Sequence, residues 1–120
     1  MSNKSEAYDY PTVRLLRSMF GDECVIAWTP RGVFDRIVVS VGFTDDLTPH
    51  MRRTDAHPSS TTLTLYGVTP NGSVDTYRLM RYAQYECEWN LTHDKPTNSP
   101  EETAEIITNL LEQARGYHRD

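Results

Sequence analysis

The fold is decided by residues 61–91, which read TTLTLYGVTPNGSVDTYRLMRYAQYECEWNL. Residues 61–68 and 73–81 both alternate between apolar and polar side chains, which is the pattern of a strand with one buried face. Asn71 and Gly72 lie between these runs, and both tolerate the positive φ of a tight hairpin turn. The stretch therefore predicts a β-hairpin in the middle of an antiparallel sheet.

The end of this stretch, residues 84–91, alternates fully and predicts a further strand. Its two faces would carry Tyr85, Cys87, Trp89 and Leu91 on one side and Gln84, Glu86, Glu88 and Asn90 on the other. A helix over residues 77–91 is the alternative, because several apolar side chains there also fall on one helical stripe. The β-prone aromatic side chains and the strict alternation favour the strand.

Two more strands are predicted upstream of residue 61. Residues 24–29 are apolar on both faces, and residues 33–43 place aliphatic side chains at alternate positions. Pro30, Arg31 and Gly32 lie between them and combine a fixed φ with a permissive one. We expect them to form the tight connection of a second hairpin.

A helix is predicted on each side of the strands. The first has Asp9 as its cap, Pro11 in its first turn and Gly21 directly after its end. The second begins with a capping box in which Ser99 caps the helix and Glu102 reaches back toward the chain before it. The apolar face of this second helix consists of Ala104, Ile106, Ile107, Leu110, Leu111, Ala114 and Tyr117.

Together these elements predict an α+β fold. It consists of an antiparallel sheet of about five strands, two hairpins plus one strand, with a short N-terminal helix and a C-terminal amphipathic helix packed on one face. The chain of 120 residues fits a single domain over residues 9–120, preceded by a flexible tail of residues 1–8. The other sheet face would keep Tyr66, Arg78 and Met80 among several threonines, a half-polar surface suited to a partner.

Composition and charge indicate which kinds of partner and which cellular location to expect. The formal net charge of −5 argues against nucleic acid as a partner, because proteins that bind it usually present a basic surface. The mean hydropathy of −0.61 and the lack of a long apolar run predict no membrane contact. The N-terminal residues show no secretory signal pattern, so we expect a soluble cytoplasmic protein.

The cysteines and tryptophans are interpreted as structural. Cys24 and Cys87 are far apart and lack a CxxC or CxxH neighbour, so we expect buried thiols rather than a disulfide or a zinc site. Trp28 and Trp89 lie inside strand patterns and are interpreted as core side chains. No cofactor or metal is predicted.

The loop at residues 44–60 contains the side chains best suited to binding chemistry. The candidate ligand-binding residues are His50, Arg52, Arg53, Asp55 and His57. Guanidinium groups suit a phosphate or carboxylate, and histidine with aspartate suits acid–base chemistry, although the spacing matches no metal-binding signature. One helical turn over residues 48–53, capped by Thr48, is also predicted here.

Three functions are compatible with this sequence. It contains no GxSxG elbow and no glycine-rich phosphate loop, which argues against an enzyme. The leading hypothesis is a non-enzymatic protein-interaction or self-associating module, a homodimer included, that uses a sheet edge or the uncovered sheet face. One alternative is an anion, small-ligand or nucleic-acid binding regulator that uses residues 44–60, and a lower one is an enzyme that uses His50 or His57.

Overall fold

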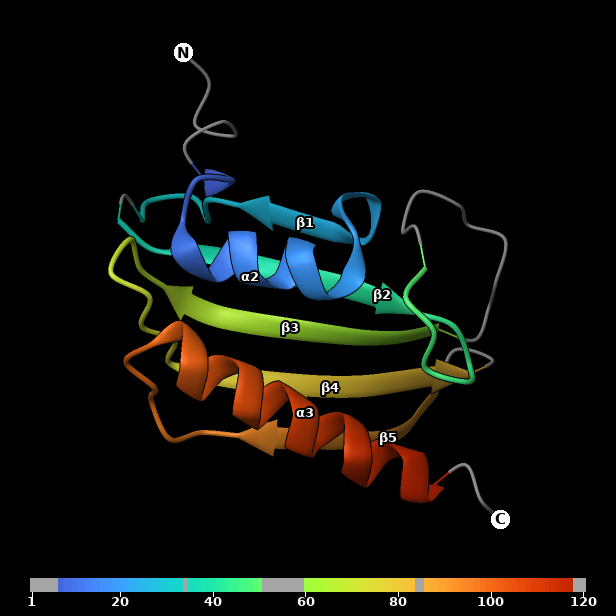
Figure 1. The fold of residues 1–120 in the computed structure, drawn as a ribbon. Coiled ribbons are helices and arrows are strands. Elements are labelled where there is room, and N and C mark those ends of the chain that lie inside the picture. Colours follow the sequence, from blue (N-terminus) through green and yellow to red (C-terminus); the bar gives the residue numbers. More distant parts are fainter. Residues whose placement is uncertain (1–6, 34, 51–59, 84–85, 118–120) are drawn as a thin grey trace.

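The computed structural model describes residues 7–33, 35–50, 60–83 and 86–117, and it is shown in Figure 1. Its elements in chain order are α2 (Pro11–Phe20), η1 (Asp22–Cys24), β1 (Val25–Trp28), β2 (Ile37–Phe43), β3 (Ser60–Val68), β4 (Thr76–Ala83), β5 (Glu86–His93) and α3 (Pro100–Tyr117). Residues 1–6 of the predicted tail lie outside the described residues. Ala7 is buried, and Tyr8 packs against the core.

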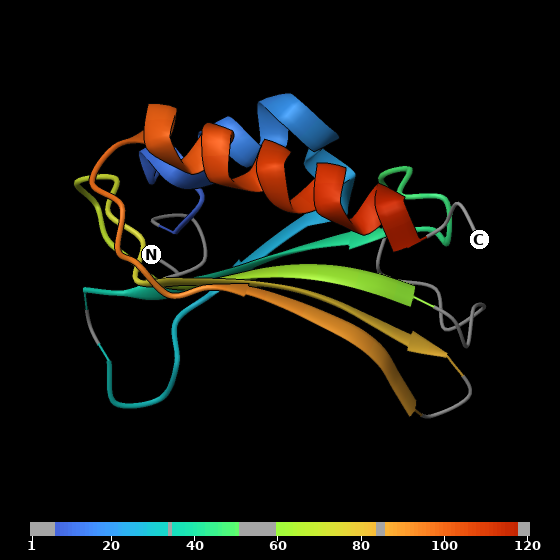
Figure 2. The same cartoon turned by 90° about the horizontal axis from the view of Figure 1, so that it is seen from below.

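The five strands form one sheet in the order β1-β2-β3-β4-β5, and every neighbouring pair is antiparallel. Both helices lie on the same face of this sheet, as Figures 1 and 2 show. The predicted α+β fold is therefore confirmed, and the alternative helix over residues 77–91 is wrong. No helix in the described part of the chain is long and apolar enough to span a membrane.

The register brings one apolar residue from each strand into a continuous row beneath the helices. This row consists of Val25, Val41, Leu63, Leu79 and Leu91. A second row runs through Ala27, Val39, Leu65, Tyr77 and His93. Helix α3 contributes Ile107, Leu110 and Ala114 to the same core, so the hydrophobic core lies between the sheet and the two helices.

Strand β2 is buried along its whole length, on both of its faces. On the helix side it meets the core, and its Phe43 packs edge-on against Phe20 of α2 with ring centroids 5.2 Å apart. On the other side Val38 and Ser40 are buried although no helix covers them. The side chains of β2 are thus buried on both sides of the sheet.

The connection between β1 and β2 is longer than the predicted tight turn. The antiparallel pairing is confirmed, with Trp28 opposite Val38. The Val33 amide donates to the Pro30 carbonyl at 3.2 Å, so a turn does form at the predicted place. The predicted strand start at Val33 is wrong, however, because that turn lies outside the sheet and β2 begins only at Ile37.

The helix ends follow the prediction in all but one respect. Pro11 occupies the first helical turn, and Gly21 ends α2 with a φ of 97°. The prediction that Asp9 caps α2 is wrong, because Tyr10 is the N-cap and no side chain bonds there. The Asp9 carboxylate instead pairs with Arg14 at 3.6 Å on the surface.

The predicted capping box at the start of α3 is confirmed. The Glu102 amide donates to Ser99 Oγ at 3.2 Å, and the Glu102 carboxylate accepts the Asn98 amide at 2.9 Å. These bonds satisfy amides that have no partner within the helix. The apolar face is confirmed for most of its length, although Tyr117 is exposed and its ring stacks on Trp89.

An irregularity in the β4–β5 ladder changes the face of one predicted strand residue. Arg81 lies opposite Trp89, but the next pair is Tyr82 with Cys87, so Glu88 is an extra residue on β5. Cys87 therefore leaves the core side and is exposed, and the prediction that it is a buried thiol is wrong. Cys24 is half-buried, and burial raises the pKa of its thiol. Gln84 and Tyr85 lie outside the described residues.

A buried polar cluster joins the sheet to the start of α3. The Tyr77 hydroxyl hydrogen-bonds to Thr97 Oγ1 at 2.5 Å and to Thr103 Oγ1 at 2.7 Å. All three residues are buried, and Thr103 is a core position that the apolar pattern of the helix did not include. Because buried hydroxyls are costly without partners, this cluster fixes the position of α3 on β4.

Replacing Tyr77 with phenylalanine tests this cluster. Tyr77→Phe keeps the ring but removes the partner of two buried hydroxyls, so we expect the free energy of unfolding to fall by about 1–3 kcal/mol. Urea denaturation followed by circular dichroism measures this change. Tyr66→Phe, at an exposed tyrosine, is the matched control and should stay close to wild type; equal stability of all three proteins would contradict the prediction.

The same tyrosine should make stability depend on pH in the alkaline range. Burial raises the pKa of Tyr77, and the nearby Glu102 carboxylate adds to the rise. The contribution of Tyr77 to the free energy of unfolding is therefore fully present below the pKa of about 10 that a tyrosine has in the unfolded chain. It is lost as the pH rises through the higher pKa of Tyr77 in the folded protein. Urea midpoints measured from pH 8 to 11 should fall less steeply in Tyr77→Phe than in wild type or Tyr66→Phe.

Candidate functional site

The loop predicted as the binding site is only partly described. Arg52, Arg53, Asp55 and His57 all lie outside the described residues, and His50 is the one predicted site residue within them. The His50 amide donates to the Gly42 carbonyl at 2.9 Å. His50 thus follows the end of β2, and the structure brings no second predicted site residue beside it within the described part.

The described half of the loop is a tight turn that returns along β2. The Thr44 amide donates to the Thr48 carbonyl at 2.8 Å, and the Thr48 amide donates to Thr44 Oγ1 at 3.1 Å. Leu47 takes a φ of 64° and turns its side chain into the core. Pro49 then pairs with Phe43 in an antiparallel bridge, so the predicted helical turn starting at Thr48 is wrong in its described part.

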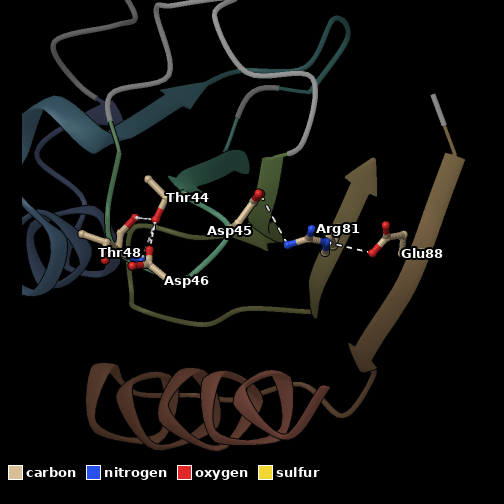
Figure 3. Close-up of polar contacts among 6 residues, drawn as sticks. All are labelled: Thr44, Asp45, Asp46, Thr48, Arg81 and Glu88. Carbon is tan, nitrogen blue, oxygen red and sulfur yellow. Dashed lines mark hydrogen bonds and ion pairs between the residues drawn. The ribbon is translucent and has the colours of Figure 1, made fainter. Parts of the chain in front are cut away.

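The carboxylates of this turn already have structural partners. The Asp46 carboxylate accepts a short hydrogen bond from the Thr44 hydroxyl, as Figure 3 shows, and this bond, followed by that of Thr48, lowers the pKa of Asp46. Among the described residues, no three histidine, cysteine, aspartate or glutamate side chains gather in a way that would hold a metal ion. The turn is therefore organised by its own hydrogen bonds.

Arg81 holds this turn against the β4–β5 hairpin. Its Nε donates to Glu88 at 2.9 Å, and its Nη1 lies 3.4 Å from Asp45, an ion pair without hydrogen-bond geometry. Figure 3 shows the guanidinium between the two carboxylates, and its side chain is only 14% exposed. The extra residue in β5 is Glu88 itself, so the bulge supplies one partner of this cluster.

Removing the Arg81 charge should cost more stability than removing an ordinary surface pair. For Arg81→Gln we expect a loss of about 1 kcal/mol in the free energy of unfolding, because two carboxylates lose a largely buried partner. The control is Arg115→Gln, which breaks an exposed pair with Glu112 at 2.9 Å and should cost about 0–0.5 kcal/mol. Urea denaturation at low and high salt measures both, and equal losses would contradict the prediction.

The sheet face opposite the helices is the second candidate, and here the described residues form a surface. Its central row consists of Ile26, Ser40, Thr64, Arg78 and Thr92, which lie side by side across the five strands. The next row consists of Gly42, Thr62, Met80 and Asn90. On β2 and β3 these two rows contain serine, glycine and threonine, while β4 contributes the larger Arg78 and Met80.

A groove of about 740 Å³ crosses this face. Its lining residues are Trp28, Pro30, Val38, Ser40, Thr62, Thr64, Tyr66, Met80 and Tyr82. Figure 2 shows the ribbon on either side: the β1–β2 connection hangs below the sheet at one end, and the neighbouring ends of β4 and β5 curve away from the helices at the other. The uncovered face is therefore concave.

Three aromatic side chains of the groove are open to solvent. Trp28 is 44% exposed, Tyr66 is 37% exposed and Tyr82 is 46% exposed. The interpretation of Trp28 as a core residue is therefore wrong, because β1 is an edge strand and its outer face has no helix over it. Trp89, by contrast, is half-buried on the helix side, where it packs against the core.

The charge on this face differs from that of the whole chain. Arg78 is the one charged residue among the described strand residues that face this way, although the net charge of the chain is −5. Arg78 is half-buried, and its Nε has no hydrogen-bond partner among the described residues. The uncovered face thus combines aromatic and apolar side chains with a single unpaired cation.

The sequence identified part of this surface. Alternation in β3 and β4 placed Tyr66, Arg78 and Met80 on the face without helices, and the structure confirms this. It missed Trp28 and Pro30, because residues 24–29 are apolar at nearly every position and alternation cannot then tell one face from the other. Comparison with protein-family models, curated proteins and solved structures found no match to this chain.

Proposed function

We propose that this protein is a non-enzymatic binding module that holds a segment of another protein on the uncovered face of its sheet. The observation that supports this is the groove, in which three exposed aromatic side chains surround a floor of threonine and serine. Exposed apolar side chains that are scattered singly are ordinary on soluble proteins, whereas those gathered along one groove are typical of a binding site. Tryptophan, tyrosine and arginine are also the side chains that most often carry the binding energy of protein interfaces.

The sheet edges are weaker candidates than this face. At one edge β1 is short, Val25–Trp28, and the segment through Pro49 continues along β2 beyond it. At the other edge β5 carries Glu86 and Glu88 exposed near its start. Short edge strands and charged side chains are devices that prevent another strand from pairing.

The open shape of the groove favours a protein segment over a small molecule. Pockets for small ligands usually bury 70–90% of the ligand surface, which needs walls on most sides. The lining of this groove comes from strands β1 to β4 and from Pro30 in the β1–β2 connection, while α2 and α3 both lie on the other face of the sheet (Figure 2). A segment longer than the groove can fill it and also contact its rim.

A second copy of the chain fits this face less well than a different protein does. Two copies stacked through the uncovered face would bring two half-buried Arg78 side chains to the same interface. Each copy also adds a net charge of −5. Like charges brought together at an interface oppose binding, so we favour a hetero-complex.

Selection from a displayed library of random peptides tests this function. Peptides enriched on the immobilised protein should lose at least about tenfold in affinity for the double variant Tyr66→Ala with Tyr82→Ala, because exposed aromatic anchors often contribute more than 1 kcal/mol each. The control is Met19→Ala on α2, which is 37% exposed like Tyr66 but lies outside the groove.

Two results would contradict the proposal. The first is a selection that enriches no peptide over the starting library. The second is a set of peptides that bind the double variant as tightly as the wild type, which would place their site elsewhere. Circular dichroism spectra of the variants confirm beforehand that each is folded.

A further inference from the structure

We infer that the segment bound on the uncovered face carries an acidic side chain that pairs with Arg78, next to an apolar or aromatic side chain that enters the groove. This inference rests on the proposed function and specifies the chemistry of its partner. It is drawn from the environment of Arg78, from the charge of the face and from the spacing along β4.

Arg78 differs from Arg17 and Arg81, the other half-buried arginines of the described chain, because it has no carboxylate within ion-pair distance there. Arg31 and Arg36 have no such partner among the described residues either, but both are exposed to water. Each of four other arginines lies within ion-pair distance of a carboxylate; they are Arg14, Arg17, Arg81 and Arg115. Arg78 has no such carboxylate among the described residues, although it is half-buried and its Nε is fully buried. Its cross-strand neighbours are Thr64 and Thr92, which carry no charge.

An unpaired guanidinium that is partly removed from water keeps a desolvation cost. The cost is offset when a carboxylate supplies charge-assisted hydrogen bonds, and the planar fork of arginine fits a carboxylate with two parallel bonds. The described strand residues of this face include no acidic side chain. A bound partner can supply the counter-charge that the described strand residues of this face do not.

The spacing along β4 sets the expected pattern in that partner. Arg78 and Met80 lie two positions apart on the same face, which corresponds to about 7 Å, and Met80 lines the groove together with Thr64 opposite Arg78. An extended peptide repeats its side-chain direction at the same two-residue interval. An aromatic residue and an acidic residue two positions apart would therefore reach the groove and Arg78 together.

A pair of matched peptides tests this inference. The probes are acetyl-Trp-Ser-Glu-amide and acetyl-Trp-Ser-Gln-amide, which share shape and aromatic group and differ in one charge. In ¹⁵N–¹H NMR titrations of the full chain at low salt, both should shift the amides of Thr62, Thr64 and Met80. The glutamate peptide should bind about tenfold more tightly, because a charge-assisted pair is stronger than a neutral one.

Variants locate the charge that causes the preference. In Arg78→Met the two peptides should bind equally, while the groove amides still shift. The control is Arg36→Met, which changes the net charge of the chain by the same amount at an exposed arginine before β2. The preference for glutamate should remain in that variant, and its loss there would assign it to long-range electrostatics and overturn the inference.

The outcomes separate this inference from the proposed function. Equal affinity of the two peptides for the wild-type protein, with shifts at the groove, would overturn the role of Arg78 and leave the binding face in place. Absence of shifts at the groove with either peptide at millimolar concentration would count against both. The comparison in wild type needs no variant, so it stands even if Arg78→Met folds poorly.

Discussion

The register of the antiparallel sheet is the constraint on which the rest of this structure depends. Because side chains alternate between faces, a slip of one residue in any pair would exchange the core side for the solvent side. The row from Val25 through Leu91 is continuous beneath the helices only because all four pairings agree. The same agreement assembles the row of Ser40, Thr64 and Arg78 on the other face, so the core and the candidate site are two results of one register.

Two arginines of β4 lie on opposite faces of the sheet and therefore have different roles. Arg78 and Arg81 are three positions apart and therefore point to opposite faces of the sheet. On the helix side Arg81 meets Asp45 and Glu88, and it connects the turn after β2 to the hairpin β4–β5. On the uncovered side Arg78 lies between Thr64 and Thr92 of the neighbouring strands. One charge is used within the fold, and the other is left at the surface that we propose binds a partner.

Much of the fold was predictable from local signals, because each depends on few residues. The Ser99–Glu102 capping box and the alternation of residues 61–68 both act over short distances in the chain. The chain does turn at Asn71-Gly72, where the Gly72 amide donates to the Thr69 carbonyl at 3.1 Å. The predicted tight hairpin is wrong, however, because Asn71 takes no positive φ and β4 begins at Thr76 rather than at residue 73. The bulge at Glu88 was not predictable, because strict alternation in sequence carries no sign of an extra residue in the ladder. The length of the β1–β2 connection was not predictable either, because the turn at Pro30 forms as expected but β2 begins only at Ile37, and Trp28 and Val38 are the first paired residues. For the site, the sequence placed Tyr66 and Arg78 correctly, while the groove required neighbours from four strands.

The burial of β2 on both faces has a consequence for the behaviour of the groove. Its backbone pairs with strands on both sides, and the side chains along the strand are buried on both faces. Segments of this kind exchange their amide hydrogens only in large, rare openings of the whole molecule. Val38 and Ser40, which belong to β2, form part of the groove lining. A partner would therefore meet a floor that is already ordered, and most of the conformational entropy lost on binding would be lost by the partner.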